Sequence, residues 1–479
     1  MKKYITALAA GLALVAGCSD TIVSSENSPT ADALNGALTA TGVQTLTLGV
    51  LANDRALARE TDYLILPEVF ARDAYRIDPN ESRYVTETLT GTPDPGSFTA
   101  SGGWTNGYVT IRAANSLLAA LPGAVSSQVS DAQKSATSGF VKTIKALEYY
   151  RLLELRDTLG IALQPADPAA VGPIICKTAA LTYIAALLDS ANADLTAAGG
   201  ATKLPIGLPS GFTKFGRDYS VTSNIVKLNR GLKGKVDLYR ALDHQAPKPA
   251  LFATAIAEIT SALGAGPGAV PASQFGTGAY VTFVAGGTEN SANSLFDNLI
   301  GVNPKAVTAF DSLDPGKVDS RRSKIIPFST GKTIAGSGIS TNLTYSGAST
   351  AVPANQTLPV AILRDEELVL LRAQAEIENN DLVNAYLDLN SVHRAYESTD
   401  LPAFANQADA RRVLLLEKRF SLFFEGPQRL VDLRAYGLLK AATTTPEVAG
   451  QDAYNTAFPI PKSEADARGG RANLNPTCS

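Results

Sequence analysis

The sequence has few cysteines and histidines, almost no methionine, and no excess of charge of either sign. Its 479 residues include three cysteines and two histidines, and the single methionine is residue 1. Three cysteines exclude a disulfide-rich scaffold and a four-cysteine metal cluster, and two histidines leave little material for a histidine-based metal site. The 42 basic residues nearly balance the 45 acidic ones, whereas a nucleic-acid-binding protein normally needs a basic face. These shortages predict a protein without a metal or other cofactor.

Apolar residues are abundant, and their distribution sets an N-terminal segment apart. Hydrophobic residues make up 45% of the chain, enough for one large core or two smaller ones. Two lysines precede an apolar run over 5–17, which is too short to cross a bilayer but has the length of the apolar part of a signal peptide. The run ends in small residues directly before Cys18.

This junction resembles the lipobox of bacterial lipoproteins, in which the cysteine thiol is acylated and the peptide is cut before it. An ordinary export signal with an incidental cysteine is the alternative. The lipobox predicts a lipoprotein signal peptide over 1–17, then the lipidated Cys18 and a flexible tether over 18–41, rich in small polar residues. The mature chain is then expected outside the cytoplasm on a lipid anchor.

Helical periodicity recurs along most of the remaining chain, whereas strand-like alternation is scarce. Apolar residues repeat every three to four positions, as expected for helices with one buried face. The predicted helices lie over 104–121, 132–159, 177–196, 222–242, 251–263, 363–378 and 382–396. The last two, with a turn at Asn379-Asn380-Asp381, resemble one tetratricopeptide repeat. We expect a mostly α fold of degenerate tetratricopeptide-like helical pairs, with helical-repeat regions over 42–263 and 361–479.

Between the two helical regions the composition changes. Residues 264–360 are rich in Gly, Ser, Thr, Pro and Asn, and helical periodicity disappears. Short strands are predicted around 279–284 and 323–328. Because a loop-rich stretch of this length inside a folded chain is usually functional, we expect a partly irregular or β insertion that decorates the helical scaffold.

A cluster of charged residues stands among leucines and phenylalanines in the C-terminal region. Its charged members are Glu417, Arg419, Glu425, Arg429, Asp432 and Arg434, and Gly426 marks a turn between them. One interpretation is a catalytic pair of carboxylates that act as acid and base. The other is a structural ion-pair network, because partly buried charges must be paired. The apolar surroundings favour the structural interpretation.

The order of residues in this segment is specific. It reads Glu417-Lys418-Arg419-Phe420-Ser421-Leu422-Phe423-Phe424-Glu425-Gly426, then Arg429 and Asp432-Leu433-Arg434. This order resembles the signature of the SusD/RagB family of nutrient-uptake outer-membrane lipoproteins. Further matches are Trp104, Ala114-Asn115, Leu363-Arg364 to Ala375, Phe458-Pro459-Ile460-Pro461 and Asn475-Pro476. Departures from the family pattern at Gln374, Lys418 and Ser421 indicate a divergent branch.

The resemblance implies a SusD-like α-superhelix, a scaffold role for the charged cluster, and a location on the outer membrane at the cell surface. It also implies a TonB-dependent transporter as partner. The lipoprotein would capture an oligomeric nutrient, expected to be an oligosaccharide, and pass it to that transporter without breaking a bond, so that no enzyme activity is expected. Two other classes stay open, namely a lipid-anchored surface hydrolase (a glycosidase or peptidase) and a tetratricopeptide-type protein-interaction adaptor.

If the protein binds a glycan, aromatic side chains should stack on the sugar rings while polar side chains bind the hydroxyls. Arginine and tyrosine concentrate between positions 70 and 84, a region that supplies ligand contacts in the family. The predicted ligand-binding residues are Arg72, Asp73, Tyr75, Arg76, Tyr84 and Trp104. A plain charged surface loop, and a core position for Trp104, are the alternatives. Weaker candidates in the insertion are Tyr280, Phe283 and Tyr345.

Two cysteines remain once Cys18 is assigned to lipid. An oxidising compartment would permit a disulfide between Cys176 and Cys478. Because the sequence gives no geometry for the pair, a disulfide and two free thiols are equally good predictions.

Overall fold

The computed structural model describes the chain from residue 38 to residue 478. It leaves out residues 59, 166–169, 285–290, 311–318, 335–336, 398, 441–452, 472–473 and 475–477. The predicted signal peptide over 1–17, the predicted lipidation site at Cys18 and the predicted tether up to residue 37 lie outside the described residues. The expected tether extends to residue 41, but helix α2 already begins at Ala40.

Helices make up most of the described chain, so the predicted mostly α fold class is confirmed. The longer helices are α2 (Ala40–Ala58), α6 (Phe98–Ala120), α7 (Asp131–Arg156), α8 (Lys177–Ala198), α9 (Thr222–Ala241), α10 (Leu251–Leu263), α12 (Asp365–Glu378), α13 (Leu382–Glu397) and α14 (Gln407–Ser421). The shorter ones are α3 (Thr61–Leu64), α4 (Leu66–Phe70), α5 (Arg83–Thr86), α11 (Pro304–Phe310), α15 (Gln428–Ala435) and α16 (Lys462–Ala467). Among the helices of the described ranges, none is both long and apolar enough to cross a membrane.

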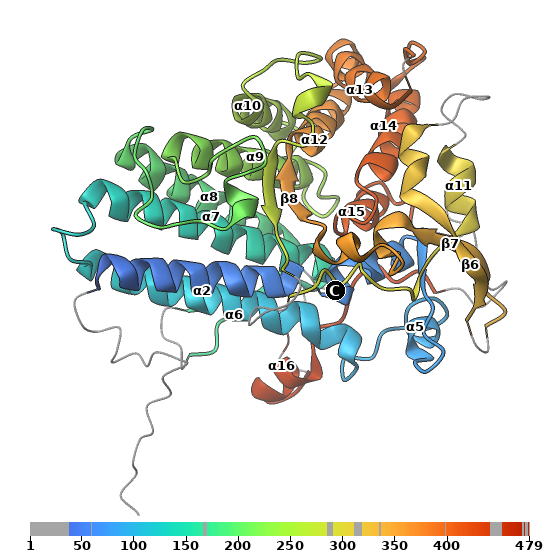
Figure 1. Ribbon diagram of the computed structural model, residues 1–479, viewed down its shortest axis with the longest axis horizontal. Coiled ribbons are helices and arrows are strands. Elements are labelled where there is room, and N and C mark those ends of the chain that lie inside the picture. The colour runs from blue at the N-terminus through green and yellow to red at the C-terminus, as the bar shows by residue number, and fades with distance from the viewer. Residues whose placement is uncertain are drawn as a thin grey trace, which may run out of the picture.

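In the N-terminal half, each long helix packs against the next one along the chain, from α6 to α10, and α2 lies along α6 (Figure 1). Helix α7 begins with a capping box, in which Ser130 accepts a hydrogen bond from the Gln133 backbone and Gln133 accepts one from the Ser130 backbone. Gly139 lets α7 approach α8 closely, since a Cβ atom here would lie 2.8 Å from the Ala191 carbonyl oxygen.

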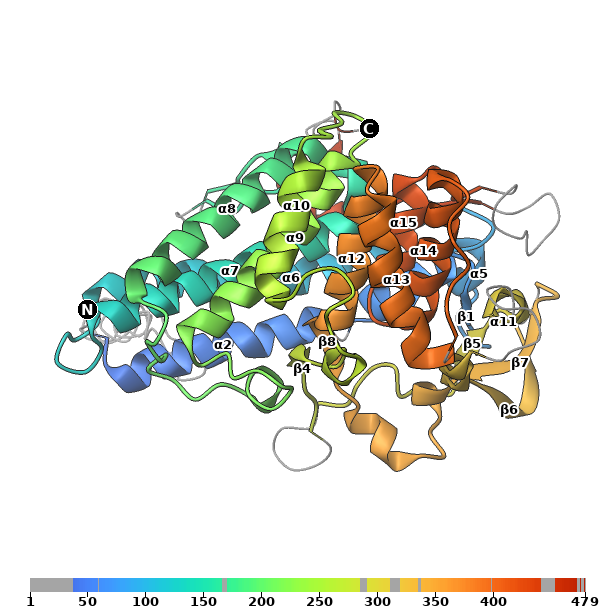
Figure 2. The ribbon, with the colours of Figure 1, turned by 90° about the horizontal axis from the view of Figure 1, so that it is seen from above.

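In the C-terminal half, α12 and α13 form the tetratricopeptide-like pair that the sequence predicts. The turn between them places Asn380 in the left-handed region, with φ of 60°, which asparagine tolerates better than most residues. Arg372 of α12 is fully buried and donates to Asp388 of α13 at 2.7 Å from Nε, so that an internal ion pair fixes the two helices. Helices α14 and α15 continue this half (Figure 2).

Most predicted helices match the observed ones to within a few residues. The prediction over 251–263 coincides with α10, whereas α6 begins six positions before the predicted start at residue 104. The prediction over 363–378 is wrong at its start, because Leu363 and Arg364 are extended and belong to strand β8. The apolar spacing did not predict α2.

The strands form small antiparallel pairs. They are β1 (Ala74–Arg76) with β5 (Ile300–Val302), β2 (Ile161–Ala162) with β3 (Ile174–Ile175), β4 (Gly278–Val281) with β8 (Val360–Arg364), and β6 (Ile325–Thr333) with β7 (Ser340–Tyr345). Strands β4 and β6 overlap the strands predicted around 279–284 and 323–328. The β4–β8 pair lies between the N-terminal helices and the group from α12 to α15 (Figures 1 and 2).

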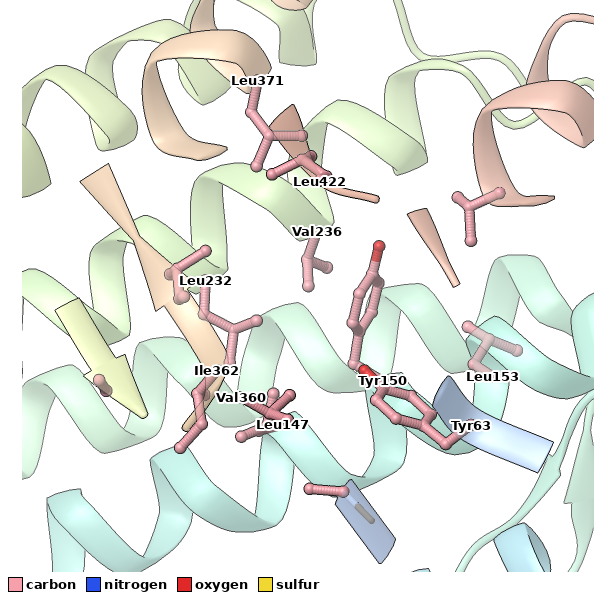
Figure 3. Packing of buried hydrophobic residues seen from close by; sticks show 14 of the residues in the cluster. Tyr63, Leu147, Tyr150, Leu153, Leu232, Val236, Val360, Ile362, Leu371 and Leu422 are labelled. Atoms are coloured by element: carbon pink, nitrogen blue, oxygen red, sulfur yellow. The ribbon is translucent and has the colours of Figure 1, made fainter. Parts of the chain in front are cut away.

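The core is continuous across these groups of helices. Figure 3 shows Leu147 and Tyr150 of α7 near Leu232 and Val236 of α9, with Ile362 of β8 beside them. These side chains are buried, with exposed fractions of 8% or less. The strand that follows the insertion is therefore packed into the same core as the N-terminal helices.

The C-terminal tail returns to the N-terminal half. Cys478 forms a disulfide with Cys176, the residue before α8, and their Cα atoms are 4.8 Å apart. Of the two predictions that the sequence left open, the structure shows the disulfide and not two free thiols. The ring of Phe458 also stacks on Phe70, with centroids 4.4 Å apart.

Candidate functional site

The carboxylate of Glu417 lies inside the molecule, between the insertion and two helices of the C-terminal half. Its side chain is 0% exposed, and one oxygen is 2.7 Å from Nη1 of Arg321 in the short helix η6 (Ser320–Lys324). The other oxygen is 2.9 Å from Nδ1 of His393 on α13. Arg321 also lies over the ring of Tyr396, 4.5 Å from its centroid. Glu417 therefore joins the insertion to α13 and α14.

Arg419 and Arg429 converge on Asp73, which directly precedes β1. Nε of Arg419 donates to Asp73 at 2.8 Å, and Nε of Arg429 is 3.8 Å from the same oxygen. Glu68 lies beside this group, and its Oε1 accepts a hydrogen bond from the Phe424 backbone at 3.2 Å. Burial, reinforced by the charge of Asp73, raises the pKa of Glu68 to about 8. Helices α14 and α15, which carry Arg419 and Arg429, are thus held against the N-terminal region near β1.

Asp432 and Arg434 of α15 bind partners on other elements. Asp432 is 2.7 Å from Nζ of Lys418 and accepts a hydrogen bond from the Tyr239 hydroxyl at 2.9 Å. Burial lowers the pKa of Lys418, although the charge of Asp432 opposes this shift. Nη1 of Arg434 donates to the Thr456 carbonyl oxygen at 2.7 Å.

Glu425 lies at the tight turn between the two helices of the signature, α14 and α15. It accepts two hydrogen bonds from Arg364, at 2.7 Å from Nε and 3.0 Å from Nη2. Gly426 follows with φ of 102°, a conformation that favours glycine, and a Cβ atom there would lie 3.4 Å from the ring of Tyr63. Each carboxylate of the charged cluster therefore has a cation as a partner, which is the arrangement of an ion-pair network rather than of an acid and base that share a substrate.

The residues predicted to bind ligand are used largely in internal contacts. Arg72 is buried, has φ of 65°, and donates to the Leu89 carbonyl oxygen at 3.0 Å. Tyr75 is buried within β1, and Asp73 is engaged by the arginines described above. Trp104 is 4% exposed, and its indole N–H donates to Glu464 at 3.3 Å. Trp104 thus occupies the core position that was its alternative.

Arg76 and Tyr84 are brought together at the surface. Arg76 forms an ion pair with Asp297 and lies over the ring of Tyr84, 5.5 Å from the centroid. Both side chains are partly exposed. Ligand contacts at the predicted residues stay a prediction, and among them Arg76 and Tyr84 are the accessible pair.

A cavity of about 180 Å³ lies where β4 and β8 meet the turn after α14. It is lined by Gly276, Tyr280, Asn293, Leu295, Tyr345, Gly347, Leu358, Pro359, Val360, Ala361, Arg364, Phe424 and Glu425. The insertion supplies most of these residues, and the charged cluster supplies Glu425. Tyr280 and Tyr345, two of the weaker candidates from the sequence, are thereby brought to one site.

The aromatic side chains of this cavity are held rigidly. The ring of Tyr280 packs on Phe215, with centroids 4.3 Å apart, and its hydroxyl donates to the Gly276 carbonyl oxygen at 2.8 Å. Burial raises the pKa of Tyr280 to about 12. The ring of Tyr345 packs on Phe424, with centroids 4.7 Å apart. Both tyrosines are partly exposed, so the site combines fixed aromatic surfaces with access to ligand.

The polar groups of the cavity are equally fixed. The side-chain amide of Asn293 donates to the Leu358 carbonyl oxygen at 2.8 Å, and its oxygen accepts from the Leu295 backbone at 2.9 Å. Glu425 is held by Arg364. Sequence reasoning assigned Glu425 only to the scaffold and gave Asn293 no role, because no local pattern shows that residues on β8, the insertion and the turn after α14 meet. Such a combination of fixed aromatic and polar groups is suited to binding a small molecule.

No group of three or more His, Cys, Asp or Glu side chains in the part of the chain that the structure describes is arranged to hold a metal ion.

Solved structures of the SusD superfamily share the architecture described above. One from Parabacteroides distasonis superposes with a TM-score of 0.66 at 13% sequence identity, over 91% of this chain and 98% of that chain. A SusD homologue from Bacteroides thetaiotaomicron gives 0.65 at 16% identity, over 92% and 98% of the two chains. The chain has the SusD fold. The family resemblance read from the sequence is therefore confirmed at the level of the fold.

The SusD fold is also shared by surface glycan-binding protein A from Bacteroides fluxus, with a TM-score of 0.65 at 14% identity over 90% of this chain and 98% of that one. No model of a known protein family matches the sequence, and no curated protein matches it either. The relation to SusD is thus carried by three-dimensional structure together with the short motifs, since overall identity is low.

Proposed function

We propose that the protein is a member of the SusD/RagB family that captures an oligosaccharide at the surface of the outer membrane and delivers it to a TonB-dependent transporter. In this proposal it breaks no bond and is not an enzyme. The observation that carries the proposal is the cavity beside β8, where two fixed tyrosine rings and fixed polar groups meet within a SusD fold. The resemblance in fold to a surface glycan-binding protein supports the choice of ligand class.

Tyr345 provides the direct test of capture. Replacing it in a Y345A variant removes a ring that is packed on Phe424 at the cavity. Loss of one stacking surface should weaken glycan binding by about tenfold, equivalent to ~1.4 kcal/mol. Affinity electrophoresis and calorimetry with a panel of neutral and acidic oligosaccharides would measure this change.

A matched control is Tyr183, which is partly exposed on α8 and packs on Tyr149, with centroids 5.5 Å apart. The Y183A variant removes an equal ring outside the cavity and should keep the wild-type affinity. Wild-type protein that retains no member of the panel would overturn the proposed function. Release of shortened sugars during these incubations would instead favour a glycosidase.

The membrane part of the proposal rests on Cys18. We expect the full-length chain to fractionate with the outer membrane, to be cleaved by protease added to intact cells, and to co-purify with a large β-barrel protein. A C18A variant should lose membrane attachment, because the anchor is the acylated thiol. Recovery of wild-type protein from membranes without a barrel partner would contradict delivery to a transporter and favour the adaptor.

A further inference from the structure

The cavity beside β8 presents one charged group that stays partly open. The Glu425 side chain is 22% exposed, whereas that of its partner Arg364 is 9% exposed. The second carboxylate bound by Arg364 belongs to Glu366, which is only 1% exposed. Among these ionic groups, a ligand in the cavity meets a carboxylate first.

Arg364 has no donor left for a ligand. A guanidinium carries five N–H groups. Two of those of Arg364 bind Glu425, one binds Glu366, and the others donate to the backbone carbonyl oxygens of Phe275 and Ser421, at 3.4 Å and 2.9 Å. The cation therefore neutralises carboxylates within the protein and offers nothing to an anionic ligand.

Lys324 is the other cation near Glu425. Its Nζ is 3.8 Å from the Glu425 carboxylate, and it donates to the carbonyl oxygens of Phe420 at 3.0 Å and Ser421 at 2.6 Å. Lys324 is not part of the cavity lining. Two of its three N–H groups are thus directed to the end of α14, and its side chain, which is 25% exposed, lies outside the lining.

The backbone around Glu425 is fixed in an uncommon conformation. Phe424 has φ of 60° and Gly426 has φ of 102°, so left-handed residues flank Glu425 on both sides. A left-handed conformation is costly for a bulky residue and persists where the surroundings enforce it, often at functional sites. Here it packs the Phe424 ring on Tyr345 while the Glu425 backbone N–H donates to the Leu422 carbonyl oxygen at 3.0 Å.

We propose that Glu425 makes this cavity selective for neutral, hydroxyl-rich ligands and excludes ligands that carry a carboxylate. The inference rests on the proposed function and names the ligand class of the same site. An ionised carboxylate only accepts hydrogen bonds and has about four lone-pair positions, of which Arg364 uses two. The remaining positions accept from neighbouring hydroxyls of a sugar, whereas an acidic sugar meets a like charge and, among the described residues that line the cavity, no cationic donor that is still free.

The test compares ligands of the same length and backbone, one with carboxylates and one without. Oligogalacturonates of one length, with free carboxylates or fully methyl-esterified, and cellohexaose with its C6-oxidised uronate form are suitable pairs. We expect wild-type protein to bind the neutral member of a recognised pair at least tenfold more tightly, and the difference to shrink as salt is raised. This measurement needs no variant, so it does not depend on any variant folding.

The E425Q variant then assigns the effect to one side chain. Glutamine keeps an acceptor for Arg364 but removes the charge, so the preference for the neutral member should fall to about threefold or less. The control is E258Q, which removes a carboxylate of similar exposure, 20%, that pairs with Arg230 outside the cavity lining. E258Q should keep the wild-type preference.

The outcomes separate the two proposals. Equal or tighter binding of the acidic member by wild-type protein overturns the role of Glu425 and leaves glycan capture standing. An unchanged preference in folded E425Q overturns it as well. Failure of wild-type protein to bind either member of every pair in a broad glycan panel instead contradicts the capture function itself.

Discussion

Most buried carboxylates described above are paired with a cation or accept a hydrogen bond. Glu397, at the end of α13, has few such partners. Its side chain is 2% exposed, and no donor group among the described residues reaches either of its oxygens, whereas the protonated carboxyl hydrogen-bonds Asp319. The nearest cation is His393, whose Nε2 is 3.5 Å away and whose Nδ1 binds Glu417. Asp319 and Arg321 of the insertion complete a cluster with Glu397, His393 and Glu417, and Arg321 forms ion pairs with Asp319 and Glu417. The cluster therefore has more carboxylates than cations unless it holds protons.

The pKa values follow from this imbalance. Burial, together with the charge of Asp319, raises the pKa of Glu397 to about 7, although His393 opposes the shift. Burial alone would lower the pKa of His393, but the hydrogen bond and charge of Glu417 outweigh it and raise that pKa. Both groups hold protons more tightly in the folded chain than in the unfolded one. Their contribution to stability is therefore complete at acidic pH and is lost as the pH rises through the folded pKa values.

Glu397 supplies the prediction at this scale. The free energy of unfolding should decrease from about pH 5 to about pH 8. An E397Q variant should reduce that decrease and should be more stable than wild type at the upper end by about 1 kcal/mol, since a buried carboxylate without a hydrogen bond is removed. Chemical denaturation at a series of pH values measures both quantities.

Asp400 offers the control for Glu397. It lies just beyond α13, is exposed, and pairs with Arg394 at the surface. A D400N variant removes one negative charge as E397Q does, but the carboxylate that it removes is exposed and not buried. Its free energy of unfolding should therefore follow the wild-type pH profile. An E397Q profile parallel to that of wild type would refute the account.

At the scale of elements, periodicity predicts those helices that bury one apolar stripe. Helices α8, α9 and α10 follow this rule, and their predicted bounds agree with the structure to within two residues. Helix α2 does not follow it, because polar side chains such as Thr47 and Asp54 occupy part of its buried face. Asp54 is bound by Arg151 of α7 at 2.7 Å, a long-range ion pair that no local spacing reveals.

The candidate site was predictable only in part, for the same physical reason. The charged cluster was found because its residues are close in sequence, and its structural interpretation agrees with the ion pairs observed. The cavity is different, since Tyr280, Tyr345 and Glu425 are brought together by the pairing of β4 with β8 and by the turn after α14. The sequence favoured the segment around Tyr84 over the insertion as the ligand-binding site, because arginine and tyrosine are concentrated there. In the structure, much of that segment is buried, and its strand β1 pairs with β5.

At the scale of the whole molecule, the segment after α15, here called the tail, packs against the N-terminal half. The signature helices dock on the N-terminal region through Asp73, and the segment after α15 returns to α7, where the Phe458 backbone donates to the Leu155 carbonyl oxygen at 2.9 Å. Arg468 then donates to the Gly172 carbonyl oxygen at 2.8 Å, close to the strand pair β2–β3. The Cys176–Cys478 disulfide is the last of these contacts, and among the described residues it is the one disulfide that joins the tail to the N-terminal half.

The disulfide supplies the prediction at this scale. It joins residues separated by 302 positions, so its loss should release considerable conformational freedom in the unfolded chain. The C176S/C478S double variant should be less stable by about 2–4 kcal/mol. Denaturation of wild type with and without a reductant, beside the double variant, would measure it.

The double variant also tests how the tail is held. Because ion pairs, hydrogen bonds and the Phe458 ring contact attach the tail independently of the disulfide, the variant should keep its glycan affinity while losing stability. Reductant should lower the stability of wild type toward that of the variant and leave the variant unchanged. A variant that matches oxidised wild type would show that these non-covalent contacts alone close the chain.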